Sequence, residues 1–175
     1  MAHTHSSDAQ TDIACAMAHG QVEAPTGERR LVAVFASPVA TQLVHLAAHV
    51  GFACVVLDPA GDLEGARSVR TAAAAGIDEH TDVVITDHDR PELGEVLAAV
   101  LETSARWVGV MGSPRHTAPH VAALQERGLP EEQIARVHRP IGLDIGSRAP
   151  AEIALSTVAG LLADRNGRDG GTYRA

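Results

Sequence analysis

The fold class of this chain is decided by one stretch, LVAVFASPVATQLVHLAAHVGFACVVLD at 31–58. An apolar run over 31–35 and another over 53–57 have the length of buried strands, and the apolar residues between them recur at helical spacing over 38–50. Two such strands on either side of a helix form a βαβ unit, which requires a parallel sheet covered by helices. The stretch therefore predicts an α/β fold.

The rest of the chain repeats this alternation of strands and helices. Polar, aperiodic composition predicts disordered tails at 1–28 and 168–175. Between them we expect a single α/β domain over 29–167, with a doubly wound, mostly parallel sheet and helices on both of its faces. Apolar periodicity predicts further strands at 82–86 and 107–111, and helices at 61–75, 90–103, 113–127, 130–137 and from Pro150 onward.

Composition and charge exclude several classes of partner. The 175 residues are 45% hydrophobic and carry a formal net charge of −8. The chain can therefore bury a normal core, but it lacks the basic surface that non-specific binding of nucleic acid or an anionic membrane needs. Two cysteines do not make a disulfide framework, the N-terminus lacks the pattern of a signal peptide, and polar residues interrupt the apolar stretch at 31–57. We expect a cytoplasmic protein that binds neither nucleic acid nor a membrane.

The turn after the first predicted strand is the place where a dinucleotide-binding domain carries its GxGxxG motif. Here Ala36, Pro38 and Thr41 stand at the three glycine positions. Pro38 has no N–H to offer a phosphate, and Ser37 before it has the form of a helix N-cap. Asp58, at the end of the next strand, either binds a ribose hydroxyl or turns the chain locally. The lost glycines argue against NAD(P) as a cofactor.

The loops that follow predicted strands contain the candidate ligand-binding residues, because open α/β sheets bind ligands at the carboxyl ends of their strands. In the loop after 82–86, Asp89 and Glu92 have the form of a helix capping box, which leaves the neighbouring Asp–His pair without a local structural role. Glycine-containing turns near positions 112 and 142 precede helices and suit an anion. The predicted cofactor-binding residues are Asp87, His88, Gly112, Ser113, Arg115, Gly142, Asp144 and Gly146.

Two of these candidates have specific expected roles. Arg115 supplies a guanidinium suited to a phosphate, and Arg139 and Arg148 are expected to assist it. Asp144 faces the ligand, or caps a neighbouring element, if Leu143 and Ile145 alternate with it and point inward.

The ten histidines do not predict a metal centre. His45 with His49, and His116 with His120, have the i, i+4 spacing of one helical face, but neither pair has the further ligand of a zincin-like site. Both pairs are interpreted as polar faces of amphipathic helices. Cys54 lies within an apolar run and is expected in the core. The sequence contains no recognisable set of nucleophile and base, so we predict neither a catalytic set nor a bound metal.

Four segments together resemble one protein family. They are VVITDHD at 83–89, WVGVMGSPR at 107–115, GLPEEQIARVH at 128–138 and PIGLDIG at 140–146. Over 31–167 the chain is similar to the C-terminal Rossmann-like domain of the xanthine dehydrogenase accessory proteins, the XdhC/CoxI family. The resemblance implies a non-enzymatic accessory protein that binds the molybdenum cofactor and helps to insert it, after sulfuration, into a molybdenum hydroxylase such as xanthine or carbon monoxide dehydrogenase. The implied partners are that client enzyme and a cysteine desulfurase.

The chain departs from the family pattern in ways that keep two alternatives open. Family members have a glycine-rich first turn, a Thr at the position of Ala149 and an additional N-terminal domain. The segment between 57 and 83 is also shorter than in the family, so we expect a strand to be missing at that sheet edge and a homodimer or another partner to cover it. The alternatives are an NAD(P)-dependent oxidoreductase and a degenerate Rossmann scaffold that binds no ligand.

Overall fold

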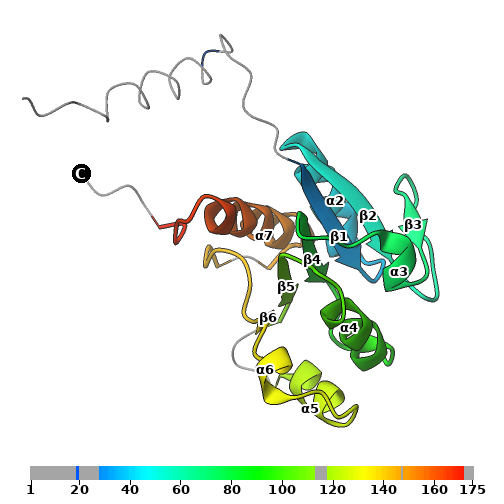
Figure 1. Cartoon of the computed structure of the whole chain (residues 1–175). Coiled ribbons are helices and arrows are strands. Elements are labelled where there is room, and N and C mark those ends of the chain that lie inside the picture. The colour runs from blue at the N-terminus through cyan, green and yellow to red at the C-terminus, as the bar shows by residue number, and fades with distance from the viewer. Residues whose placement is uncertain (1–18, 20–27, 113–117, 147, 172–175) are drawn as a thin grey trace, which may run out of the picture.

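In the computed structural model, the chain forms a six-stranded sheet flanked by helices (Figure 1). The structure describes residue 19 and residues 28–112, 118–146 and 148–171. The strands are β1 (Arg29–Val34), β2 (Phe52–Leu57), β3 (Ser68–Val69), β4 (Thr81–Ile85), β5 (Trp107–Val110) and β6 (Val137–His138). The helices are α2 (Pro38–His49), α3 (Ala72–Ala75), α4 (Leu93–Leu101), α5 (Pro119–Gln125), α6 (Glu131–Ile134) and α7 (Pro150–Arg165).

The strand order confirms the predicted doubly wound α/β fold. The order is β3-β2-β1-β4-β5-β6, and every neighbouring pair is parallel. Strand β1 is central, since its residues pair with 52–57 of β2 on one side and with 81–85 of β4 on the other. Because the order reverses between β1 and β4, their carboxyl ends form the point at which open α/β sheets bind ligands.

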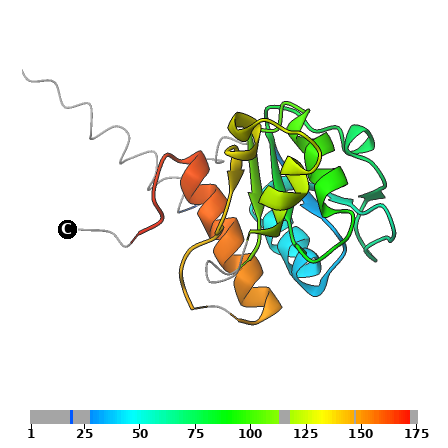
Figure 2. The ribbon, with the colours of Figure 1, turned by 90° about the horizontal axis from the view of Figure 1, so that it is seen from below.

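Two apolar cores cover the two faces of the sheet. On one face, α2 and α7 pack against each other and cover alternate strand residues such as Leu31 and Val84. On the other face, α3, α4, α5 and α6 cover the residues that point the opposite way, such as Val32 and Val83. Figure 2 shows α7 in orange on one side of the strands, with α4 and α5 in green and yellow-green on the other. The helices cover both faces of the sheet, and the carboxyl ends of the strands form the edge at which open α/β sheets bind ligands.

The predictions for the segment after β2 are wrong. Residues 61–75 were expected to be one helix, but they contain the short strand β3 and the single short helix α3. Strand β3 pairs with β2 through the N–H of Val56, which donates to Arg67 O at 2.8 Å, and the N–H of Asp58, which donates to Val69 O at 3.0 Å. These bonds satisfy backbone groups of β2 that a helix would leave unpaired. The strand expected to be missing is therefore present, and the argument that a partner must cover that edge no longer holds.

Strand β6 was also not predicted, because it follows directly on a helix. The segment 130–137 was expected to be helical throughout, but α6 ends at Ile134. Val137 then pairs with Val108 of β5. Two paired residues are too few to show the alternation by which a strand is recognised in a sequence.

The remaining helices follow the predictions with shorter bounds. The segments expected to be helical at 90–103 and 113–127 contain α4 and α5. Residues 113–117 lie outside the described residues, as do most residues of the predicted tails. Helix α7 begins at Pro150, as expected. Within the described part of the chain, no helix combines the length and apolar character that crossing a membrane would need.

Candidate functional site

The turn between β1 and α2 is closed by the chain's own side chains. Ser37 caps α2 as predicted, because its hydroxyl accepts a hydrogen bond from the N–H of Ala40 at 3.0 Å and Pro38 follows as the first helical residue. At the end of β2, the carboxylate of Asp58 accepts a hydrogen bond from the N–H of Ala36 at 2.8 Å. A carboxylate of the protein thus uses a backbone donor in the turn that serves a pyrophosphate in dinucleotide-binding domains.

Arg90 completes this closure. Its guanidinium donates to both carboxylate oxygens of Asp58, at 3.3 Å each, and it lies 4.8 Å from the ring centroid of Phe35. With the N–H groups of Ala36 and Ala60, Asp58 accepts four hydrogen bonds, which is the full capacity of a carboxylate. Burial alone would raise the pKa of Asp58, but these hydrogen bonds and the Arg90 charge outweigh it and hold the pKa below its ordinary value. Asp58 is therefore ionised and has no acceptor position left for a ribose hydroxyl.

The predicted capping box of Asp89 and Glu92 is wrong. Helix α4 begins at Leu93, and the carboxylate of Glu92 makes no cap hydrogen bond. It binds the guanidinium of Arg90 instead, at 3.2 Å, because a charged donor attracts it more strongly than a backbone N–H does. Asp89 is exposed, and its N–H donates to the carboxylate of Asp87 at 3.0 Å. These residues form a turn before the helix rather than a cap.

Three of the predicted site residues lie at the carboxyl ends of neighbouring strands. Asp87 and His88 follow β4, and Gly112 follows β5, which pairs with β4. Asp87, His88 and Gly112 are all half-buried. The other two predicted residues of this region, Ser113 and Arg115, lie outside the described residues. The structure thus places part of the predicted site at the edge where such sheets bind ligands.

His120 joins this edge, although the sequence interpretation placed it on an exposed helix face. It is 4% exposed, because it shares the buried face of α5 with Leu124, four residues further on. Among the described residues, its Nδ1 atom has no hydrogen-bond partner. Arg139, after β6, lies against Gly112, where an added Cβ would be 2.6 Å from the Nη2 atom. Burial lowers the pKa of His120, and the charges of Arg139 and His88 lower it further.

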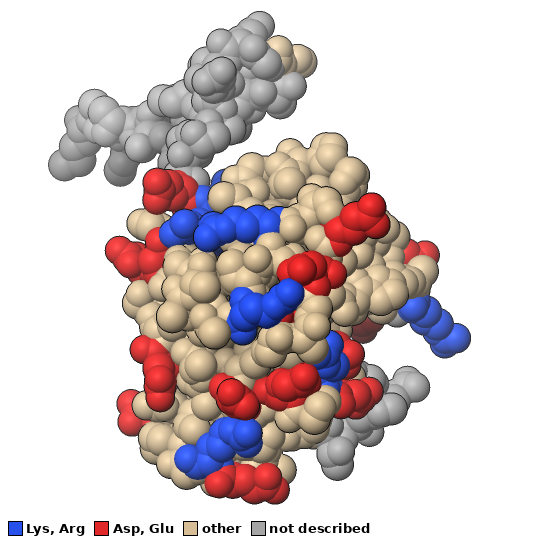
Figure 3. Space-filling model, turned by 90° about the vertical axis from the view of Figure 1, so that its right-hand side faces the viewer, with Lys and Arg blue, Asp and Glu red and all other residues tan. Residues whose placement is uncertain are grey.

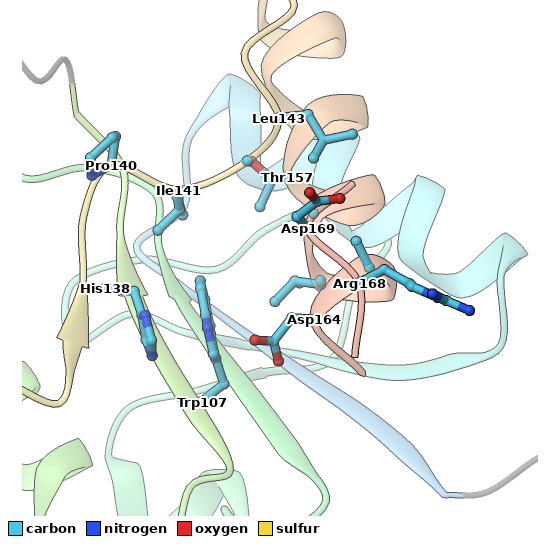
Figure 4. Close-up of a pocket in the computed structure, with 13 residues that line it drawn as sticks. Trp107, His138, Pro140, Ile141, Leu143, Thr157, Asp164, Arg168 and Asp169 are labelled. Atoms are coloured by element: carbon cyan, nitrogen blue, oxygen red, sulfur yellow. The ribbon is translucent and has the colours of Figure 1, made fainter. Parts of the chain in front are cut away.

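The remaining predicted residues lie in the loop between β6 and α7. Gly142 lines a pocket of about 220 Å³ between this loop and α7 (Figure 4), whereas Asp144 and Gly146 are exposed. The expectation that Ile145 points inward is wrong, since its side chain is 52% exposed. Its N–H bonds back to the carbonyl of Leu143 at 3.0 Å, so the loop is turned rather than extended and strand-like alternation does not apply.

This pocket has an aromatic wall and a charged rim. The rings of Trp107 and His138 stack with centroids 5.1 Å apart and planes 9° apart. The indole occupies the space beside Gly109, which has no side chain, and an added Cβ there would overlap the ring. In Figure 4, Asp164 and Arg168 lie on the other side of Trp107. Neither Trp107 nor His138 was predicted as part of a site. A tryptophan two positions before a glycine, or a single histidine in a short strand, is not a recognisable binding motif.

Neither the surface charge nor the thiol of Cys54 indicates a further functional site among the described residues. On the face in Figure 3, acidic and arginine side chains intermix, so neither sign dominates it. Among the described residues, no group of three or more His, Cys, Asp or Glu side chains is placed to hold a metal. Cys54 packs against the core, and burial raises the pKa of its thiol to about 11. The thiol is therefore protonated at neutral pH and unsuited to act as a nucleophile.

The parallel sheet, its point of reversed strand order and its two helix layers define a Rossmann-type domain. A family model described as the XdhC Rossmann domain matches residues 31–161, and the chain belongs to this family. The resemblance inferred from the four sequence segments is thereby confirmed.

Two curated relatives and one solved structure are similar to this chain. The uncharacterized protein YqeB of Escherichia coli (strain K12) is 32% identical over 154 residues, which cover 81% of this chain and 28% of YqeB. The molybdenum cofactor insertion chaperone PaoD of the same organism is 31% identical over 88 residues, which cover 50% of this chain and 28% of PaoD. A crystal structure described as a xanthine dehydrogenase from Bacillus halodurans aligns with a TM-score of 0.63 and 29% identity, over 81% of this chain and 44% of that one. The chain spans 28% of the length of each curated relative.

Proposed function

We propose that this protein is an accessory protein for the maturation of a molybdenum hydroxylase and that it binds the molybdenum cofactor. The observation that carries the proposal is membership of the XdhC Rossmann family together with similarity to PaoD, a molybdenum cofactor insertion chaperone. The whole activity of these longer relatives is part of the proposal, because the chain spans a minor part of their length.

The donors at the carboxyl ends of β4–β6 fit the anionic part of such a ligand. The cofactor is a pterin with a phosphate end, and Arg139, His88 and His120 offer a guanidinium and two imidazoles at one edge. The bound cofactor supplies molybdenum chemistry to the client enzyme, and the residues of this chain bind and orient it. The residues that we propose for cofactor binding are Asp87, His88, Gly112, Ser113, Arg115, Gly142, Asp144 and Gly146.

A scaffold that binds no cofactor is the second candidate, and one observation favours it. The first turn of the sheet is closed by Asp58 and Arg90, so the binding place used by dinucleotide-binding relatives of the fold is filled from within. The same closure argues against an NAD(P)-dependent oxidoreductase. The contacts of this closure do not include the residues after β4, β5 and β6 that the cofactor proposal uses.

Equilibrium binding of molybdenum cofactor released from a mature hydroxylase tests the proposal. We expect saturable binding to the purified chain, weakened by His88→Ala, Arg115→Ala and Asp144→Asn. Asp62→Asn is the matched control, since its exposed carboxylate only pairs with Arg70 at the surface. Absence of saturable cofactor binding would contradict the proposal and favour the scaffold.

The proposed partners are the client hydroxylase and a cysteine desulfurase that supplies sulfur before insertion. Size-exclusion chromatography of the chain mixed with cofactor-free hydroxylase, and separately with the desulfurase, is expected to show co-elution. We also propose a homodimer. The expectation of a dimer came from a sheet edge that was thought to lack a strand, and β3 occupies that edge. A monomer in light scattering at high protein concentration would contradict the dimer without bearing on the other partners.

A further inference from the structure

The pocket of about 220 Å³ between α7 and the loop after β6 is framed by defined contacts (Figure 4). The N–H of Leu143 in the loop donates to the carbonyl of Ser156 in α7 at 3.1 Å. The segment after α7 folds back over the loop, where an added Cβ on Gly170 would overlap the side chain of Leu143. The loop, the helix and the segment that follows the helix are thus held together around the pocket.

Small residues keep the space inside this pocket unfilled. Gly109 of β5 pairs with His138 of β6, and the Trp107 indole occupies the space that the missing side chain leaves. On the opposite wall, α7 presents Gly160 and Ala163, which are three residues apart and therefore lie on one helix face. A larger side chain at either of these two positions would occupy the pocket.

The indole of Trp107 presents an aromatic face to this space. One face of the indole stacks on His138, with the ring planes 9° apart. Figure 4 shows Asp164 and Arg168 on the side of the indole that points away from His138. The second face of the indole is therefore turned toward the pocket. A flat aromatic wall opposite small residues suits a planar ring, because aromatic rings stack favourably in offset, parallel arrangements.

Polar groups of α7 and the segment after it surround the same space. Thr157 is 2% exposed, and its hydroxyl donates to the carbonyl of Ile153 at 2.8 Å, so its oxygen can still accept a hydrogen bond. Asp164 accepts a hydrogen bond from Nη1 of Arg106 at 2.6 Å, and a carboxylate has acceptor positions for further donors. The exposed guanidinium of Arg168 adds a donor at the rim. The two acceptors favour a ring that carries N–H groups at its edge.

We propose that this pocket binds a planar, fused heteroaromatic ring that carries an amino group, with the ring stacked on Trp107 and its N–H edge bound by Asp164 and Thr157. Pterins and the purine guanine share this chemistry. A volume of about 220 Å³ suits one fused ring system, whereas larger ligands occupy pockets of roughly 300–1,000 Å³. The inference rests on the proposed function only for the identity of the ring, since the molybdenum cofactor contains a pterin.

Titration followed through the indole N–H signal in the ¹H–¹⁵N spectrum tests the site, because Trp107 is the single tryptophan of the chain. We expect a saturable change with biopterin or guanosine, and a much smaller change at equal concentration with uridine, whose single ring buries less area. Inosine lacks only the amino group of guanosine and should bind at least about fivefold more weakly, because a hydrogen bond to Asp164 is lost.

The same titrations decide between the two sources of the ring. A response to biopterin alone identifies a pterin, and a response to guanosine alone identifies a purine. A signal that neither compound alters overturns the proposal, as does equal binding of guanosine and either inosine or uridine.

Two leucine substitutions in α7 form a matched pair. Ala163→Leu places a larger side chain in the pocket and should weaken ring binding by at least about tenfold. Ala151→Leu makes the same change at an exposed position that does not line the pocket, so it should leave binding unchanged. Equal losses in both variants overturn the proposal, and the wild-type titration decides it even if Ala163→Leu fails to fold.

Asp164→Asn tests the polar contact separately from the shape of the pocket. In this variant guanosine should lose its preference over inosine, a result that a loss of packing alone would not produce. A preference that Asp164→Asn retains would contradict the role of Asp164.

Ring binding and cofactor binding can be measured separately. Ring binding by the wild type without binding of released molybdenum cofactor would contradict the proposed function and leave this inference standing. Saturable cofactor binding that leaves the indole signal of Trp107 unchanged would overturn this inference and leave the proposed function standing.

Discussion

The backbone N–H of Ala36 donates a hydrogen bond to the carboxylate of Asp58, at 2.8 Å, across the first turn of the sheet. In dinucleotide-binding domains this turn and this acidic position both serve the ligand, whereas here they bind each other. The Asp58 carboxylate places a negative charge beside the N-terminus of α2, where a pyrophosphate otherwise lies. The turn is thus complete without a nucleotide.

We predict that the chain does not bind NADH or NADPH. Asp58 is saturated with hydrogen bonds, and Pro38 has no N–H to offer a phosphate. Titration monitored by nicotinamide fluorescence should show no saturable enhancement, in the wild type or in Pro38→Gly. Saturable binding to the wild type would contradict the closed turn.

Asp58→Asn should destabilise the protein by about 2 kcal/mol, because it removes a buried charge that Arg90 and two backbone N–H groups bind. Urea denaturation measures the change. Asp62→Asn is the control, and its exposed pair with Arg70 should contribute less than about 1 kcal/mol. Equal losses in the two variants would show that the closure of the first turn does not stabilise the fold.

Asp82→Asn should destabilise the protein by about 3 kcal/mol or more, because two half-buried cations lose the buried anion that they share. Asp82 is 0% exposed and accepts hydrogen bonds from the Nε atoms of Arg106, at 2.6 Å, and Arg165, at 2.7 Å. These contacts join β4, the residue before β5 and the end of α7. Thermal unfolding of Asp82→Asn beside Asp164→Asn, which removes a partly exposed partner of Arg106, measures the difference. The Asp164 variant should lose much less, and the reverse order would contradict the prediction.

The stability of the protein should fall with acidification in a way that Asp78 partly controls. Its hydrogen bond from the Thr81 hydroxyl, followed by that from Arg30, lowers its pKa from 3.8 to about 2. The unfolded chain therefore takes up this proton at a higher pH than the folded chain does. The contribution is fully present above a pH of about 4 and is lost as the pH falls to about 2.

Urea midpoints of the wild type and Asp78→Asn over this pH range check the assignment. The acid-induced decrease should be smaller in Asp78→Asn, because the variant has no carboxylate to protonate at this position. The Asp62→Asn variant should keep the wild-type dependence on pH. Identical pH profiles for all three proteins would show that Asp78 does not contribute.

Gly109→Ala should displace the indole of Trp107 and destabilise the protein by about 1–3 kcal/mol, since an added Cβ would overlap the ring. Trp107 is the single tryptophan of the chain, so the fluorescence emission spectrum reports on its stacking with His138 directly. Gly61→Ala is the control, because an added Cβ there meets no atom within 4 Å. An unchanged emission spectrum in Gly109→Ala would contradict the described packing.

The sequence by itself determined the fold class, because apolar periodicity is a local property that burial imposes on every strand and helix. It also determined the loss of the nucleotide motif and the cap of α2, since Ser37 and Pro38 act within a single turn. The family followed from four short segments for the same reason: each keeps its residues at fixed spacing along the chain.

Only the tertiary structure decided what depends on residues far apart in the chain. Strands β3 and β6 form because they pair with backbone groups of β2 and β5. A segment of two residues is too short to show the alternating pattern from which a strand is predicted. Asp58 meets Ala36 and Arg90 across 22 and 32 positions of sequence. The burial of His120 beside Arg139 likewise depends on where α5 and β6 pack. Such contacts are fixed by packing in three dimensions, and spacing along the chain does not contain them.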